Sequence, residues 1–199
     1  VAVLTLGGGV LAETLPDGFN PDTMMPSSQV QRGMKAVGRS VFHGVEITEF
    51  SMEILAVLEK ANSGKDLIIG RVLDGPVVER QCGVMGGMSG SPVFVDGKII
   101  GAIAFTYIFE KEPVCGITCI ESMLVALDRP KASAPVQTTD VGLESPPHAA
   151  VESYASRSGE FTVSGREVSQ VKIVRRAQAM KGFEGDGTLL MCPVFAPVY

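Results

Sequence analysis

Short runs of β-branched and other apolar residues, bounded by Gly, Asp, Asn or Pro, dominate the middle of this sequence. The runs cover residues 53–58, 66–72 and 92–105. In the last run, Val-Phe-Val is followed by Asp96-Gly97 and then by Lys-Ile-Ile, and Asp-Gly supplies the positive φ angles of a type I′ hairpin turn. Residues 121–127 predict one short helix, which Arg129-Pro130 would end. No longer amphipathic helical period occurs, so the sequence predicts a mainly β chain.

The composition is that of a core-forming protein. The chain has 199 residues, of which 45% are apolar and 20% charged, with a formal net charge of −5. A chain of this size can form one domain or two small ones. Since the charge is mildly acidic and no Lys/Arg run occurs, we expect no nucleic-acid partner.

The first twelve residues are apolar or small and carry no charge. The stretch is too short to span a bilayer, which takes about 20 residues, and we expect no stable membrane span. It has the length of a signal-peptide apolar region, and Val10 and Ala12 would be the small residues before a cleavage site. Residues 1–12 therefore predict a signal-peptide remnant and a secreted or periplasmic location in the cell envelope. The alternative is a buried first strand.

The four cysteines are Cys82, Cys115, Cys119 and Cys192. In an oxidising compartment they could form disulfides in three ways, and sequence does not choose among them. Buried small thiols are an equally good interpretation. The spacing of Cys115 and Cys119 fits neither a redox C-x-x-C pair nor a zinc site, and we expect no metal and no cofactor.

Changes in composition divide the chain into further stretches. Residues 13–28 predict an irregular lead-in, and residues 29–130 hold nearly all the strand-like sequence. Residues 131–158 are rich in Pro, Ala, Ser and Thr, which is typical of a linker or a long loop. Residues 159–199 alternate again, and we expect the start of a further β segment that is cut short.

The chemistry concentrates at Gly87-Met88-Ser89-Gly90-Ser91-Pro92. Glycines on both sides of a serine allow a tight turn that exposes the hydroxyl group. Such a turn can direct the amides of Gly87 and Ser89 at one oxygen, forming an oxyanion hole for acyl transfer. The alternative is a plain Gly/Ser turn that opens the hairpin.

The stretch GMSGSPVFVDGKIIGAIAF resembles the nucleophile region of chymotrypsin-like serine peptidases, and more closely that of the SpoIVB peptidase family. Residues 116–124 (GITCIESML) resemble the sequence that closes the SpoIVB domain, and the likeness spans about residues 30–127. The resemblance implies a chymotrypsin-like (trypsin-like) double β-barrel serine peptidase fold, incomplete in this chain.

The same resemblance assigns site residues. It implies that Ser89, and not Ser91, is the nucleophile, and that Asp74 is the acid that orients the base histidine. The plain alternative for Asp74 is a turn residue before Gly75. The resemblance also implies that Ala102, Ile103 and Ala104 lie on an edge strand to which a peptide substrate adds.

Histidine is where this sequence departs from the family pattern. A serine needs a base to remove its proton, and only His43 and His148 are present. Neither lies in a motif that matches the family's histidine, and we expect His43 to be a surface residue. The sequence thus predicts a serine endopeptidase of SpoIVB type, acting on protein or peptide substrates, that is inactive in this chain because the base is missing. The alternatives are a non-catalytic β-barrel that binds extended peptides by strand addition, and a structural domain held by disulfides.

Overall fold

The structure is a computed structural model that describes residues 15–62, 64–107, 112–127, 153–179, 181–185 and 187–194. The predicted signal remnant at residues 1–12 lies outside the described residues. So do His148 and the greater part of the predicted linker.

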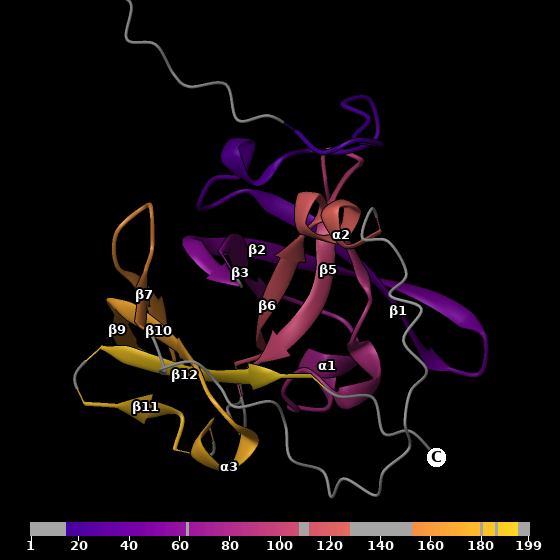
Figure 1. Ribbon diagram of the computed structural model, residues 1–199. Coiled ribbons are helices and arrows are strands. Elements are labelled where there is room, and N and C mark those ends of the chain that lie inside the picture. The colour runs from indigo at the N-terminus through magenta and orange to yellow at the C-terminus, as the bar shows by residue number, and fades with distance from the viewer. Residues whose placement is uncertain are drawn as a thin grey trace, which may run out of the picture.

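Six antiparallel strands close into a barrel (Figure 1). They are β1 (Lys35–His43), β2 (Glu46–Asn62), β3 (Lys65–Val72), β4 (Pro92–Val95), β5 (Lys98–Thr106) and β6 (Val114–Cys119). Their spatial order is β4-β1-β2-β3-β6-β5, and β5 pairs back with β4. All three predicted runs lie in these strands. The mainly β, chymotrypsin-like barrel class is confirmed.

The hairpin between β4 and β5 turns at Asp96-Gly97, as predicted. Asp96 has a φ of 49° and Gly97 a φ of 77°. Both angles lie in the left-handed region that a type I′ turn requires. The two strands then pair from Val95↔Lys98 to Pro92↔Ala102.

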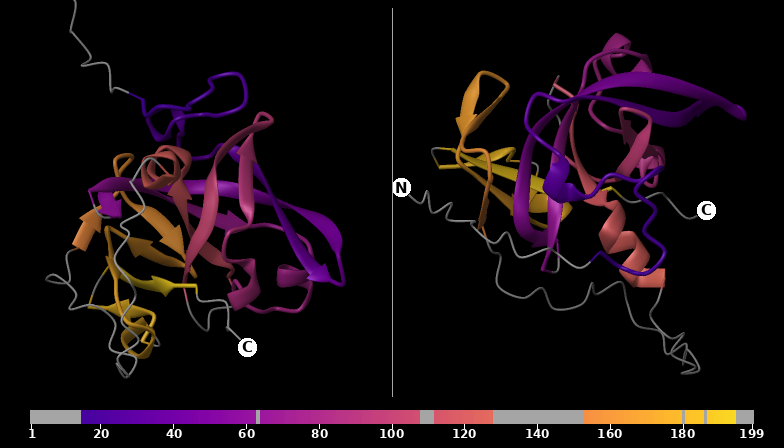
Figure 2. Two further views of the ribbon diagram at one scale, coloured as in Figure 1. Left: turned by 45° about the vertical axis from the view of Figure 1, so that its right-hand side comes forward. Right: turned by 90° about the horizontal axis from the view of Figure 1, so that it is seen from above.

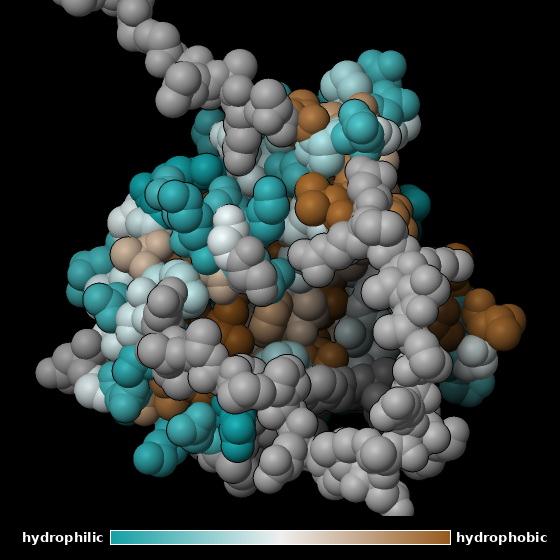
Figure 3. All heavy atoms as spheres, in the orientation of Figure 1, coloured by the Kyte–Doolittle hydropathy of each residue, from teal (hydrophilic) through white to brown (hydrophobic). Residues whose placement is uncertain are grey.

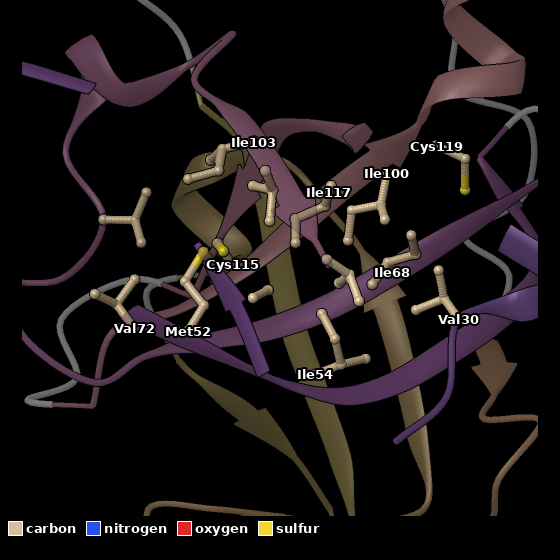
Figure 4. Close-up of a cluster of buried hydrophobic side chains, with 14 of the residues drawn as sticks. Val30, Met52, Ile54, Ile68, Val72, Ile100, Ile103, Cys115, Ile117 and Cys119 are labelled. Atoms are coloured by element: carbon tan, nitrogen blue, oxygen red, sulfur yellow. The ribbon is translucent and has the colours of Figure 1, made fainter. Parts of the chain in front are cut away.

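Apolar side chains from all parts of the barrel wall fill its interior (Figure 4). Along β1, exposed and buried residues alternate, as they do in a strand with one face toward solvent. In contrast, the middle of β2 and of β3 is buried on both faces. A second layer of structure therefore covers the barrel at these strands.

The second layer comes from the C-terminal part of the chain (Figure 2). It contains β7 (Ser153–Ala155), β8 (Phe161–Val163), β9 (Arg166–Val168), β10 (Gln170–Ile173), α3 (Arg176–Ala179), β11 (Phe183–Glu184) and β12 (Thr188–Pro193). β12 joins this layer to the barrel by pairing with the end of β5. Its apolar side chains pack with those of Leu58, Leu67 and Ile69 in a second core.

Strand β7 corrects one sequence boundary. Its residues belong to the segment 131–158 that was predicted as a linker or long loop. β7 pairs with β10, and Arg157 N–H donates a 2.8 Å hydrogen bond to the Val57 carbonyl of β2. These long-range partners hold the end of that segment in the sheet, which its polar composition did not indicate.

Short helical segments lie at the ends of the barrel strands. They are η1 (Ser27–Gln29), α1 (Pro76–Glu79), η2 (Gly86–Met88) and α2 (Ile120–Leu127), the last matching the predicted helix. The lead-in runs beside β5, where Met25 N–H donates to the Ile99 carbonyl at 3.0 Å. In the part of the chain that the structure describes, no helix is long and apolar enough to cross a membrane.

Cys115 and Cys119 are buried thiols at the two ends of β6. Four residue steps along the strand separate their Cα atoms by about 13 Å, whereas a disulfide requires less than about 7 Å. Of the pairings that the sequence left open, the one that joins these two cysteines is therefore excluded.

Candidate functional site

Ser89 lies in a tight turn between η2 and β4. Met88 is 1% exposed and anchors the turn in the barrel core, while its neighbours Gly87 and Ser89 are exposed. Gly90 follows with a φ of 84°, and its N–H donates to the Ile103 carbonyl at 2.8 Å. One buried apolar residue and one left-handed glycine thus direct the Ser89 side chain outward.

Ser89 lines a cavity of about 430 Å³. The cavity wall comes from β1, β2, β4 and the turn itself: Arg39, Ser40, Val41, Ile47, Gly87, Ser89, Gly90, Ser91, Pro92 and Phe94. Ser91 also belongs to this wall but is 7% exposed, and its hydroxyl donates to that of Ser40 at 2.8 Å. Burial and this hydrogen bond make Ser91 a structural residue and leave Ser89 as the accessible hydroxyl.

The predicted oxyanion hole is closed in this structure. The Ser89 N–H, predicted to be one of its donors, donates instead to the Gly86 carbonyl at 3.3 Å. This bond belongs to the 3₁₀ turn of η2, which directs the Gly86 oxygen to the amide of Ser89. The sequence could not reveal this because a Gly-Gly peptide can take either orientation.

Asp74 lies in the loop between β3 and α1, and it is exposed. Its Oδ1 accepts a 2.6 Å hydrogen bond from the N–H of Ser51. It lines a second cavity, of about 660 Å³, and not the one that contains Ser89. The two cavities adjoin, since Arg39 and Phe94 line both. The structure therefore brings Asp74 to the same region as Ser89 without placing the two in one cavity.

Arg39 is a site residue that the sequence analysis missed. Its guanidinium lies 4.7 Å from the centre of the Phe94 ring, and its Nη2 is 2.8 Å from Oε1 of Glu49. Arg39 therefore forms the boundary between the two cavities. The Glu49 carboxylate and the Phe94 ring compensate its charge. No local pattern marks it, because Phe94 reaches it only through the pairing of β1 with β4.

The predicted substrate strand is corrected by the structure. Ala102 and Ile103 pair with β6 on one side. On the other side, Ile103 N–H donates to the Ser91 carbonyl at 3.0 Å, and the Ala104 carbonyl accepts from Val194 N–H at 2.7 Å. With partners on both sides, this stretch of β5 is not a free edge. Val194, in the C-terminal segment, occupies the edge of β5 at Ala104, where the prediction placed a substrate.

His43 is exposed at the end of β1 and pairs with Glu46 across the hairpin. It does not line the Ser89 cavity, whose described wall has one ionisable residue, Arg39, and no proton acceptor. Nor do the described residues include a group of three His, Cys, Asp or Glu side chains that could hold a metal ion.

A family model described as SpoIVB peptidase S55 matches residues 14–124. The matched stretch contains all six barrel strands, Asp74 and Ser89, and it ends within α2. No curated protein and no solved structure matches the chain. Because the family model covers more than half of the sequence and coincides with the barrel that carries Ser89, the chain belongs to the SpoIVB peptidase S55 family.

Proposed function

We propose that this chain carries Ser89, the nucleophile of a serine endopeptidase of SpoIVB type. The observation that supports the proposal most is the exposed Ser89 on a Gly-flanked turn, at the wall of a cavity of about 430 Å³. The turn lies inside the stretch that matches a peptidase family. A peptidase of this family has protein substrates, and the cavity has the size of a small binding site.

The reaction proposed is acyl transfer through a covalent intermediate. The Ser89 Oγ attacks the carbonyl carbon of the scissile peptide bond while its proton passes to a base. The amine leaves with a proton from that base, and water then hydrolyses the acyl-enzyme ester. The negative oxygen formed at each addition needs amide donors, the role proposed for Gly87 and Ser89.

Opening the oxyanion hole requires one peptide to rotate. Turning the peptide plane between Gly86 and Gly87 would remove the Gly86 carbonyl from the Ser89 N–H and would aim the Gly87 N–H at the cavity. The rotation inverts the sign of φ at Gly87, which glycine tolerates and other residues do not. Substrate binding would favour the rotated form because it supplies the oxygen that the two amides bind.

The base is proposed to come from residues other than the described wall of the cavity. Arg39 cannot accept a proton, and His43 does not line the cavity. Asp74, held by the Ser51 amide in the adjoining cavity, is proposed to orient that base. Since neither His43 nor His148 lies in a motif that matches the family's histidine, we expect the 199-residue chain itself to be inactive or nearly so. Ser89-dependent peptide hydrolysis by it would overturn this expectation.

Fluorophosphonate labelling of the full gene product tests the proposal. The probe should attach to Ser89, and Ser89→Ala should abolish labelling. Ser91→Ala is the matched control, because Ser91 lies in the same turn but is buried against Ser40. Labelling that persists in Ser89→Ala would contradict the proposed nucleophile.

A further inference from the structure

Strand β1 has an edge beside Ser89 that no other described strand covers. It pairs with β2 from Lys35 to His43, but with β4 only at Val37 and Gly38. Before Pro92 the main chain no longer pairs with β1: Ser91 contacts it only through the hydroxyl of Ser40, and Gly90 bonds to β5. Among the described residues, no strand pairs with residues 39–43 on that side of β1. Every second residue of this stretch therefore presents its N–H and C=O to an open side.

Apolar side chains stand next to this free edge. Val41 and Ile47 are directly opposite each other on β1 and β2, and they are 49% and 69% exposed. Both line the cavity that contains Ser89, together with Phe94. Hydrophobic spheres project at the right edge of the molecule, where the β1–β2 hairpin extends (Figure 3). A cross-strand apolar pair this exposed is available to pack against a ligand.

The charge at the cavity does not favour a charged ligand. Arg39 is its one ionisable residue in the described wall, and Glu49 and the ring of Phe94 already engage the guanidinium. A carboxylate placed here would have to share the Arg39 guanidinium with Glu49, and an ammonium group would meet no acidic side chain on the described wall. An aliphatic or aromatic side chain would lose no such interaction and would bury apolar area.

We infer that an extended peptide substrate adds as a strand to the free edge of β1 at residues 39–43. It places a large aliphatic or aromatic side chain against Val41 and Ile47, next to the bond that Ser89 attacks. The inference rests on the proposed function, because it assigns the binding subsite of the same serine. Main-chain hydrogen bonds to β1 hold the peptide, and the apolar contact selects its sequence. This subsite takes the place of the one predicted on β5.

Peptide binding to the full gene product carrying Ser89→Ala tests the inference without hydrolysis. The probes are fluorescein-labelled Ala/Ser hexapeptides in which Leu, Asp or Lys occupies each position in turn. Fluorescence anisotropy should show one position at which Leu binds about tenfold more tightly than Asp or Lys, the gain expected for burying such a side chain. N-methylation of alternate peptide amides should weaken binding, because it removes the strand hydrogen bonds.

Variants of the hairpin locate the subsite. Ile47→Lys should remove the preference for Leu, whereas Val45→Lys should keep it, since Val45 is 94% exposed on the same hairpin and does not line the cavity. Matching circular dichroism spectra and melting temperatures establish that both variants are folded. The inference is overturned if Leu, Asp and Lys peptides bind equally, or if Ile47→Lys binds like Val45→Lys.

The proposed function has a separate readout. The Ser89 protein without a hairpin substitution should label with a small fluorophosphonate, because that probe does not need a bound peptide. Absence of labelling in all Ser89 proteins, with the Leu preference intact, would overturn the peptidase proposal and leave the subsite standing. Normal labelling without any Leu preference would overturn the subsite and leave the peptidase proposal standing.

Discussion

Gly87 is the residue at which the conformation of the Ser89 turn can be tested. A Cβ added there would meet no atom within 4 Å in the observed structure, and its φ is not in the left-handed region. Alanine is therefore compatible with the closed oxyanion hole but disfavours the rotated peptide that would open it.

We expect Gly87→Ala to change the free energy of unfolding by less than about 0.5 kcal/mol. The rate of fluorophosphonate labelling of the full gene product should fall about tenfold or more, since one oxyanion donor is worth at least that. Urea unfolding and labelling time courses measure the two effects. A variant that labels as fast as the wild type would contradict the proposed peptide rotation.

The buried thiol of Cys115 should make the stability of the folded barrel depend on pH in the alkaline range. Burial raises the pKa of its thiol from 9.0 to about 12, and this effect exceeds the lowering by a hydrogen bond with the Gly70 backbone. Between these values the folded protein keeps the proton and the unfolded chain loses it. Stability should therefore fall as pH rises from about 9 toward 12, by up to about 1.4 kcal/mol per pH unit for this one thiol.

Urea unfolding at several pH values from 8 to 11 measures this effect when the wild type is compared with Cys115→Ala. The wild type should lose stability more steeply than the variant, so the difference between the two free energies of unfolding should change with pH. A difference that stays constant across this range would show that the Cys115 thiol does not titrate on unfolding.

At the scale of elements, the close approach of β5 to β6 depends on Gly101. A Cβ at this position would lie 2.0 Å from the backbone oxygen of Thr118. The strands would have to separate, because a main-chain atom cannot move away as a flexible side chain can. Gly101→Ala should reduce the free energy of unfolding by more than about 2 kcal/mol.

Gly90→Ala is the matched control for this clash. Gly90 has a left-handed φ of 84° but open space at its Cβ position, so alanine there adds backbone strain alone, about 1 kcal/mol. Thermal and urea unfolding of both variants separate the cost of the clash at position 101 from the cost of backbone strain at position 90. Equal losses would mean that β5 and β6 adjust to the added methyl group.

The β1–β2 hairpin is the element whose role was least evident in advance. Its strand pattern is regular, yet its tip carries Val41, Val45 and Ile47 on the surface instead of in a core. Apolar residues at alternating positions predict a strand equally well whether they face a core or a ligand. Only the placement of the tip beside the Ser89 turn gives these residues a proposed function.

At the scale of the whole molecule, Arg157 ties the C-terminal layer to the barrel and the lead-in. Its Nη2 donates to the carbonyls of Ser27 and Val30 at 2.8 and 3.2 Å, and its Nη1 lies 3.7 Å from Oδ2 of Asp66. The family match ends at residue 124, but the folded unit therefore includes residues beyond it.

Arg157→Ala should lower the free energy of unfolding by about 1–3 kcal/mol, because two partly buried carbonyls and one carboxylate lose a charged donor. Arg175→Ala, at an exposed position in the same layer, should change it by less than about 0.5 kcal/mol. Differential scanning calorimetry should show one transition for each protein. Two separate transitions in the wild type would contradict a single folded unit.

The sequence by itself determined the local structure of this protein. The strand runs at residues 53–58, 66–72 and 92–105, the Asp96-Gly97 turn and the exposed Ser89 followed from local apolar runs and from the φ angles that glycine permits, which act within a few residues. The family resemblance, carried by contiguous motifs, was evident for the same reason.

The tertiary structure decided which groups are free to act. The pairing of β5 with β4, Ser91 and Val194 removed the predicted substrate edge, and the short pairing of β4 with β1 left another edge open among the described residues. The stacking of Arg39 on Phe94 and the separation of Asp74 from the Ser89 cavity arise in the same way. Each depends on contacts between residues far apart in the chain, and no local pattern encodes such contacts.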